Sequence, residues 1–474
     1  GILTLDRETL GEYFGENNIV LTANVADGGT ISKITTVNIP VLLVTKYIGT
    51  ADELLKLRDY AVDVNGGVGG YFVQTADLDA DGQRIGFGTW SNELNSWVDT
   101  FVGVYDGRGH VISDMVQGTN QGMFASINGG AVVKNVTFMN AVLNGNGGLI
   151  ATAQYDALIE NVVVYGSVGA GATGETWAPN GLIVSKAYEN SVIRNCLVVV
   201  KDHIYTGTLR GGSIECAGMA VGDDQSKGTS VIEHVIAVNL KGGDALDDYV
   251  LPAIGTSDGS VGRRVAGTDR DTVHTFRGWE EYVAWAADRD LSAYAGDNWE
   301  ILENNTPVTK AASVKELLKT ADITNTTTNV TAGSVTVIEG SGWYALYSLE
   351  TSEDGIAFEN GAVRVPAGLA AVTFTVKAVS LLDSSVTDSV TFAVVENIDI
   401  AVSDTLTAEY AGDSIIEIDL NGYDVVGTLD SVSIASKQFA SPVYEGGIIK
   451  LSDKSALKSL MGQNEIIVVF KTER

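Results

Sequence analysis

A short pattern that returns four times between residues 101 and 240 constrains the fold of this 474-residue chain more than any other feature. Each copy begins with a glycine, continues with apolar residues and reaches an Asn or His 13 to 16 residues later. The four pairs are Gly122 and Asn135, Gly148 and Asn161, Gly181 and Asn195, and Gly218 and His234. The distance from one copy to the next varies from 26 to 39 residues, counted between the Asn or His positions. A nearly constant half-unit with variable insertions predicts a solenoid whose insertions form loops on one side.

Composition favours β structure and excludes several classes of partner. The chain contains 54 glycines, 6 prolines and many short alternating runs of Val, Ile and Thr, which are typical of turn-rich β proteins. Its net charge of −30 is spread along the chain and repels nucleic acid and anionic membranes, so we expect no nucleic-acid partner. No apolar run reaches the roughly 18 residues of a membrane span. Cys196 and Cys216 lie in apolar runs, which predicts buried free thiols rather than a disulfide or a metal site.

The repeats are accompanied by longer strings that resemble a known group of proteins. Residues 101–112 read FVGVYDGRGHVI, and the repeats read GMF…VVKNV and GLI…IENV. Together with YFVQTADLD at 71–79 and NWEILENNTP at 298–307, they resemble bacterial surface proteins that carry GLUG-type repeats. The resemblance covers roughly residues 47–310. It implies a right-handed parallel β-helix of the pectate-lyase-like type, in which the motif residues are structural.

In such a β-helix, equivalent residues of successive coils stack about 4.8 Å apart. Asn135, Asn161 and Asn195 would then form a ladder at one corner, where Asn tolerates the left-handed conformation and its amide can bond the next coil. The four glycines would occupy another corner that needs a tight bend. We expect all of these residues to be scaffold, and we predict no catalytic residue among them.

Two short helices are expected at the open ends of the solenoid. Thr50 and Glu53 have the spacing of a capping box, which predicts a helix at about 50–60 over the first open edge. Residues 279–285, WEEYVAW, have helical spacing and are expected to cover the second edge.

The flanking segments predict additional β modules, so that the whole chain is all-β. Residues 311–396 and 397–474 carry short strands at intervals of about 8–12 residues and no cysteine pair, which predicts two immunoglobulin-like β-sandwiches. Residues 1–46 are too few for a sandwich of their own. Asp6 to Val20 matches Asp453 to Ile467 at one fixed offset (453 − 6 = 447). We interpret 1–46 either as the tail of an immunoglobulin-like module or as strands completed by a neighbour. With no initiator Met, signal peptide or anchor motif, the chain is expected to be a mature or excised piece of a longer protein.

Three aspartates suggest a cation site. Asp77, Asp79 and Asp81, followed by Gly82, match the first half of a calcium-binding loop. The twelfth position of that loop, where a bidentate Glu is expected, is Gly88. Calcium is the one cofactor that the sequence suggests. Asp77 and Asp79 can also be explained without calcium, because alternate residues of a strand lie on the same face.

Charged groups that could serve an enzyme are spread over one stretch of the chain. A β-helix lyase or glycosidase needs carboxylates gathered on one outer face. The groups available are Asp223, Asp224, Asp244, Asp247, Asp248, Asp258, Arg263 and Arg264. Their spacing does not repeat with the coils, so we interpret them as a loop surface. Asp106 and His110 lie in a Gly-rich turn and are expected to be structural.

Aromatic residues in the insertions are the candidate ligand-binding groups. Trp90, Trp97 and Trp177, with Tyr155 and Tyr188, should project from the coils, where aromatic rings can stack on sugars or pack against the solenoid. The expected function is therefore that of an extracellular, non-enzymatic surface protein. It would serve adhesion, binding of a glycan or host-surface protein, or structural display. The alternatives are a β-helix polysaccharide lyase or glycoside hydrolase, and a phage virion protein at the virion surface. The sequence predicts no oligomeric state.

Overall fold

The computed structural model of the chain consists mainly of β strands with a few short helices, which confirms the all-β class. It divides into two compact units, Gly1–Glu396 and Asn397–Arg474. The structure describes residues 13–27, 30–64, 67–118, 121–145, 147–169, 180–203, 217–226, 228–240, 253–254, 271–351, 353–359, 361–369, 372–395, 416–419, 428–434, 437–438, 442–451 and 466–471.

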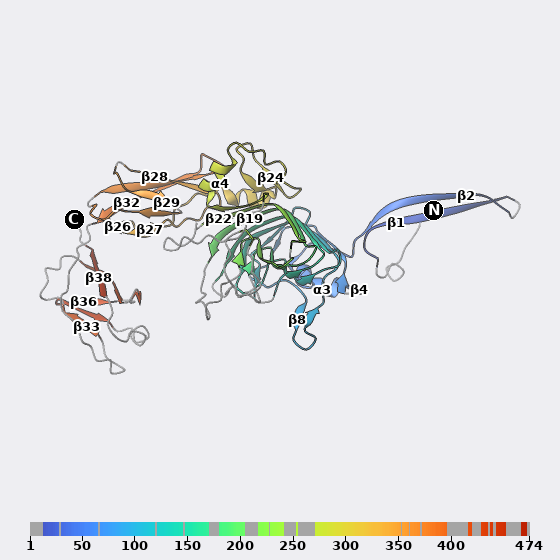
Figure 1. Ribbon diagram of the computed structural model, residues 1–474, viewed down its shortest axis with the longest axis horizontal. Helices are drawn as coiled ribbons and strands as arrows, with labels where there is room; N and C mark the ends of the chain where they lie inside the picture. Colours follow the sequence, from blue (N-terminus) through green and yellow to red (C-terminus); the bar gives the residue numbers. More distant parts are fainter. Residues whose placement is uncertain are drawn as a thin grey trace. The chain divides into compact units, whose positions relative to one another are not determined.

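A long parallel sheet forms the main body of the first unit (Figure 1). Its main strands are paired in the order in which they follow along the chain, each parallel to the next. They are β3 (Lys46–Ile48), β6 (Tyr71–Gln74), β10 (Val104–Asp106), β14 (Val132–Leu143), β16 (Leu158–Val168), β19 (Val192–His203), β22 (Val231–Asn239) and β23 (Val273–Arg277). Three short strands extend it, β7 (Leu78–Asp79), β11 (Val111–Ser113) and β12 (Val116–Gln117).

A second parallel sheet shows that the chain runs in repeated coils. It contains β13 (Phe124–Ile127), β15 (Ala151–Gln154), β18 (Val184–Ala187) and β21 (Val221–Asp224). These strands alternate along the chain with β14, β16, β19 and β22 of the long sheet, so each coil gives one strand to each sheet. A short third pair, β17 (Asn180–Gly181) and β20 (Ala217–Gly218), is also parallel. This arrangement is consistent with the predicted parallel β-helix.

Left-handed residues mark one corner of the coils. Asn135, Asn161, Asn195 and His234 have φ angles of 55°, 53°, 53° and 52°. Asn161 Nδ2 donates a hydrogen bond to Asn135 Oδ1 at 3.2 Å, so these two amides bridge adjacent coils. Asn195 Nδ2 departs from this ladder and donates to the backbone carbonyls of Ala293 and Tyr294 at 2.9 and 3.0 Å. The corner therefore fixes both the stacking of two coils and the position of the segment near residue 294.

The repeated glycines allow close packing between coils rather than a left-handed bend. Gly148 bridges Gly181, and Gly181 pairs with Gly218 on the next coil. None of Gly122, Gly148 and Gly181 has a positive φ. A Cβ on Gly181 would lie 2.2 Å from the carbonyl oxygen of Val184. The chain does bend at or directly after these glycines, at residues 122–123, 149–150, 182–183 and 219–220, as expected. The glycines are needed there because a side chain would collide with backbone atoms, not because the backbone is left-handed.

The interior of the coils is a continuous apolar core. Phe101 and Phe124 stack face to face with ring centroids 4.0 Å apart. Leu54 of α2 (Ala51–Leu55) and Leu57 of α3 (Leu57–Tyr60) are buried in the same core. These two short helices take the place of the single predicted helix and follow β3, the edge strand of the long sheet. The hairpin of β4 (Val62–Val64) and β5 (Gly67–Gly69) comes next.

The outer face of the long sheet is also buried, and this was not expected. Apolar side chains from six strands of this sheet, β11, β14, β16, β19, β22 and β23, form a second core, the outer-face core, with later parts of the chain. Those parts are α4 (Trp279–Ala286), the antiparallel pair β24 (Trp299–Ile301) and β25 (Pro307–Thr309), α5 (Ala312–Lys315), the 3₁₀ turn η1 (Leu317–Lys319) and residues 343–344. Burial on both faces explains why strands such as β16 and β19 are apolar along most of their length.

The helix α4 was expected at the second open edge, and it packs on β23, the strand at that edge, where the rings of Tyr282 and Trp285 meet Phe276 with centroids 5.1 and 5.0 Å apart. It also contributes Trp279 to the outer-face core, where the Trp279 ring stacks on Tyr344 with centroids 4.4 Å apart. The Tyr344 hydroxyl in turn hydrogen-bonds the Tyr165 hydroxyl at 2.9 Å. Residues 279–344 are thereby joined to the coils in a single folded unit.

Two facing sheets complete the described part of the first unit. A four-stranded sheet contains β26 (Asn329–Thr331), β28 (Ala345–Glu350), β31 (Thr373–Ser380) and β32 (Thr387–Val395), and a three-stranded sheet contains β27 (Val335–Val337), β29 (Ala357–Glu359) and β30 (Ala362–Arg364). Phe374 and Phe392 stack with centroids 5.2 Å apart in the core between them.

The second unit contains two three-stranded antiparallel sheets. One is formed by β33 (Ile416–Asp419), β36 (Val443–Glu445) and β37 (Ile448–Leu451), and the other by β34 (Thr428–Ile434), β35 (Lys437–Gln438) and β38 (Ile466–Lys471). Near the start of the chain, β1 (Gly15–Asp27) and β2 (Thr30–Leu43) form a long antiparallel hairpin (Figure 1).

Cys196 gives a first testable expectation. Its thiol is free and buried, and burial raises its pKa to about 12. Because the thiolate is the reactive form, a chain carrying Cys216→Ser should not react with a thiol reagent at pH 8 until it is unfolded. Absorbance of the released chromophore, with and without denaturant, measures this. Rapid stoichiometric labelling of the folded variant would contradict the burial of Cys196.

Candidate functional site

Four aromatic residues gather on one surface of the coils, which we call the aromatic surface: Trp90, Trp97, Tyr155 and Tyr188. Trp90 belongs to β8 (Thr89–Ser91) and Trp97 to β9 (Ser96–Val98), and the two residues pair directly across this hairpin. Their rings meet edge to face with centroids 5.3 Å apart, and Trp90 is 36% exposed. The β8–β9 hairpin projects from the coils (Figure 1), so its tip is open to solvent.

The two tyrosines occupy equivalent positions on consecutive coils. Tyr155 directly follows β15 and Tyr188 directly follows β18, and these strands are paired in register. Their rings stack in parallel, with centroids 4.2 Å apart and planes 6° from each other. The side chains of Tyr188 and Trp97 lie close enough to the Tyr155 hydroxyl to lower its pKa, although burial outweighs them. The Trp pair of the hairpin and the stacked tyrosines of the coils therefore meet at the Tyr155 hydroxyl.

The chemistry of the aromatic surface is that of neutral rings with hydrogen-bonding groups at their rim. Burial raises the pKa of both tyrosine hydroxyls, and the negative charges of Asp223 and Glu189 add to the effect at Tyr188. Both hydroxyls thus stay protonated at physiological pH. Partly exposed aromatic faces beside hydroxyl and carboxylate groups suit a ligand that has apolar faces and many hydroxyls, as sugars do.

The three aspartates of the calcium-like motif are not gathered into one site. Asp77 accepts hydrogen bonds from His110 Nδ1 and the Val111 backbone N–H, both at 3.1 Å, and from the Ser313 hydroxyl. Asp79 instead accepts from the backbone N–H of Asp81 at 2.8 Å, which forms a local turn. Among the described residues, no group of three or more His, Cys, Asp or Glu side chains is placed to hold a metal ion. In this arrangement the three side chains serve turns and inter-segment bonds, and calcium binding by the motif stays a prediction.

The Asp77 carboxyl is held in its ionised form by these partners. Burial raises its pKa, but the hydrogen bonds from Ser313, the Val111 N–H and His110 outweigh burial and lower the pKa below the usual value. A lowered pKa means that this carboxylate contributes stability at pH values above its ordinary pKa. That contribution is lost as the pH falls through the lowered value.

Removal of calcium is accordingly expected to leave the fold unchanged. Thermal unfolding of the chain in excess EDTA and in millimolar CaCl₂ should give the same midpoint, since a ligand that binds only the native state would raise it. Differential scanning calorimetry measures both. A midpoint that rises with calcium, and that loses this dependence in Asp79→Asn, would restore the motif as a cation site.

The other sequence candidates are either structural or outside the described residues. Asp224 accepts hydrogen bonds from the Ser230 hydroxyl at 3.0 and 3.1 Å, and Asp223 accepts from Gln225 at 2.7 Å. Asp106 accepts from the backbone N–H of Arg108 at 3.0 Å, as expected for a turn. Residues outside the described part of the chain are Trp177, Cys216, Asp244, Asp247, Asp248, Asp258, Arg263 and Arg264.

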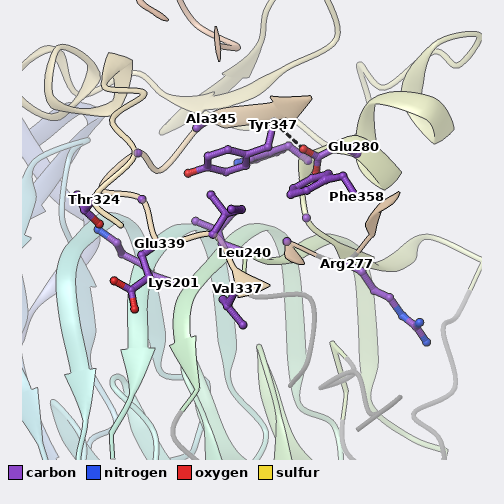
Figure 2. A pocket seen from close by; sticks show the side chains of 16 residues that line it. Lys201, Leu240, Arg277, Glu280, Thr324, Val337, Glu339, Ala345, Tyr347 and Phe358 are labelled. Atoms are coloured by element: carbon purple, nitrogen blue, oxygen red, sulfur yellow. Dashed lines mark hydrogen bonds between the residues drawn. The ribbon is translucent and has the colours of Figure 1, made fainter. Parts of the chain in front are cut away.

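A cavity of about 300 Å³ lies where the long parallel sheet meets the two facing sheets (Figure 2). Leu240, Val337 and Phe358 give it apolar walls. Two of its polar side chains are bonded within the protein: Lys201 Nζ donates to the Ser341 carbonyl at 3.0 Å, and Glu280 accepts from the Tyr347 backbone N–H at 2.9 Å. These bonds connect the coils to the following sheets, so we interpret the cavity as a junction.

The alignment of Tyr155 with Tyr188 was the feature that sequence reasoning missed. Both tyrosines were noted as loop aromatics, without a shared position. They lie 6 and 7 residues before Asn161 and Asn195, respectively. Counting back from the corner asparagines would have placed them on neighbouring coils.

Comparison with known proteins gives little beyond the geometry. No family model matches the chain, and no curated protein matches it. One solved structure that matches is described as a "putative immunoglobulin A1 protease from Bacteroides ovatus". It is 15% identical, the match covers 56% of this chain and 91% of that chain, and the TM-score is 0.31. A likeness at this level supports no argument about fold or activity. Within the described residues, no helix is both long enough and apolar enough to cross a membrane.

Proposed function

We propose that this chain is an extracellular, non-enzymatic surface protein that binds carbohydrate through the aromatic surface. The observation that carries the proposal is the parallel stack of Tyr155 and Tyr188 on two consecutive coils, with the Trp97 side chain of the hairpin close to the Tyr155 hydroxyl. Residues 33 or more apart in sequence (188 − 155 = 33) are thus organised into one platform at the surface. Stacked rings of this kind offer an extended apolar strip against which successive sugar units can lie.

The surrounding architecture supports a display role. The parallel sheets support a right-handed parallel β-helix of the kind found in surface proteins with GLUG-type repeats. The facing sheets of residues 329–395, and the two small sheets of the second unit, support immunoglobulin-like sandwiches. In this proposal the sandwiches act as a stalk and the β-helix presents the ligand-binding surface, at a cell surface or a virion surface.

Binding to a glycan array followed by titration calorimetry tests the proposal. Trp97→Ala and Tyr155→Ala should each weaken binding about tenfold, which corresponds to about 1.4 kcal/mol. Tyr47→Ala is the matched control, because Tyr47 is 54% exposed and lies on β3, outside the aromatic surface. That variant should bind as the parent chain does.

Other outcomes would redirect the proposal. New reducing ends or unsaturated products during incubation with a glycan would replace it with a polysaccharide lyase or glycoside hydrolase. If Trp97→Ala and Tyr155→Ala left binding unchanged, the glycan-binding site would lie outside the aromatic surface. Failure to bind any glycan would favour recognition of a host-surface protein or structural display.

A further inference from the structure

The N-terminal hairpin is an incomplete β sheet. β1 and β2 pair over their whole length, and among the described residues no third strand pairs with either of them. Apolar side chains on the hairpin are exposed: Val20 is 58% exposed, Leu21 40%, Val37 51% and Leu42 42%. A two-stranded hairpin is only marginally stable in water, and an open strand edge is a template for another strand.

The two edges of the hairpin are not equivalent. β2 contains Pro40, opposite Asn18 of β1, and proline lacks the N–H that a further strand would need. β1 has neither a proline nor a charged residue between Ile19 and Asn24. Charged residues and prolines are the devices that protect an edge from pairing. The open edge of β1 is therefore the one suited to receive a strand.

The sequence of β1 indicates which strand it would pair with. Ile19 to Asn24 aligns with β38 (466 − 19 = 447), at the same offset that matches Asp6 with Asp453. In the second unit, β38 pairs antiparallel with β34, from Ile466 opposite Ile434 to Lys471 opposite Thr428. β1 thus matches β38 in sequence, and the strand that pairs with β38 is β34.

We propose that β1 is a donor strand that completes a module of the same kind as residues 397–474. It would add beside the strand equivalent to β34, in the place that β38 takes in the second unit, as in recognition by β-strand addition. The shared alignment fixes the register, because Leu21 takes the place of Val468 and faces Val432. Val432 is fully buried, so an apolar residue is required opposite it. The proposal is independent of carbohydrate binding.

The test uses the chain itself as donor and a shortened copy as acceptor. The acceptor ends at Glu465, which removes β38 and leaves β34 open, and it carries Leu21→Lys so that it cannot donate. Mixed with the intact chain, it should form a one-to-one complex in size-exclusion chromatography with light scattering. A donor with Leu21→Lys should bind at least tenfold more weakly, because a charge would then lie against Val432. Leu42→Lys, an equally exposed leucine on β2, should bind as the parent does.

A second measurement does not depend on a folded acceptor. A fluorescent peptide spanning residues 426–436 should bind the intact chain in an anisotropy titration, at least tenfold more tightly than it binds the Leu21→Lys variant. A peptide with Ser431→Pro should not bind. The proposal would be overturned if no complex formed in either experiment. It would also be overturned if Leu21→Lys left binding unchanged while Leu42→Lys weakened it.

Discussion

Replacing Trp279 with alanine is expected to destabilise the first unit by about 3–5 kcal/mol, the usual cost of removing a fully buried Trp. Trp279 is 1% exposed, stacks on Tyr344 and meets Tyr282 edge to face with centroids 5.5 Å apart. Its Nε1 donates a 2.6 Å hydrogen bond to the backbone carbonyl of Trp343. Truncation would therefore leave a cavity and a buried carbonyl without its donor, which adds to the cost.

The effect of Trp279→Ala should be local as well as large. Urea unfolding gives the loss of free energy, and limited proteolysis of the folded variant should show new cleavage between residues 279 and 344. Trp279→Phe should recover part of the stability by filling the cavity without restoring the hydrogen bond. Trp90→Ala, at a partly exposed Trp of the β8–β9 hairpin, is the control and should cost much less. Equal losses for Trp279→Ala and Trp90→Ala would contradict a structural role for the outer-face core.

The outer-face core also limits where a ligand can bind. Outward side chains such as Tyr165, Leu197 and Val199 are fully buried beneath the later segments of the chain. This face of the long sheet is therefore closed to a polymer. The side of the coils that follows β15 and β18 carries partly exposed rings instead. The division of the solenoid into a covered face and an open face supports placing recognition at the aromatic surface.

The corner of the coils was the most predictable part of the structure. Asn135 and Asn161 recur at a constant distance from a glycine, and few residues other than Asn and Gly adopt a left-handed conformation easily. A repeat that ends in Asn therefore specifies both a backbone conformation and a side chain able to bond the next coil. His234 occupies the same corner with a φ of 52°, so the geometry persists where the amide is absent.

The outer-face core could not be predicted from the repeats, because it depends on contacts between distant segments. An apolar run such as Val162 to Tyr165 indicates burial but does not identify what covers it. Trp343 and Tyr344 lie within residues 311–396, where the sequence predicts a sandwich, and alternation alone does not reveal that their rings pack on another sheet. The same limit applies to the aromatic surface, where Trp97 reaches Tyr155 only after the β8–β9 hairpin has folded onto the coils.

Replacing Gly181 with alanine is expected to destabilise the coils by about 3 kcal/mol or more, because overpacking a rigid site costs 1–3 kcal/mol and occasionally more. The added Cβ would lie 2.2 Å from the Val184 carbonyl oxygen and 2.4 Å from the Gly222 backbone nitrogen. Both obstacles are backbone atoms, one of them on the next coil, so no side-chain rotation can relieve the contact. The coils would have to move apart, which weakens the parallel pairing of β18 with β21.

Gly130→Ala separates this steric effect from the general cost of replacing glycine. Gly130 has a φ of 81° and no atom within 4 Å of the position of an added Cβ. Alanine at position 130 would meet no steric obstacle and would only have to adopt the left-handed conformation, which costs about 1–2 kcal/mol of free energy. Urea unfolding of the two variants should therefore rank Gly181→Ala as the more damaging, although its backbone conformation is ordinary. If Gly130→Ala were the more destabilising, the close approach of the coils at Gly181 would not depend on the missing side chain.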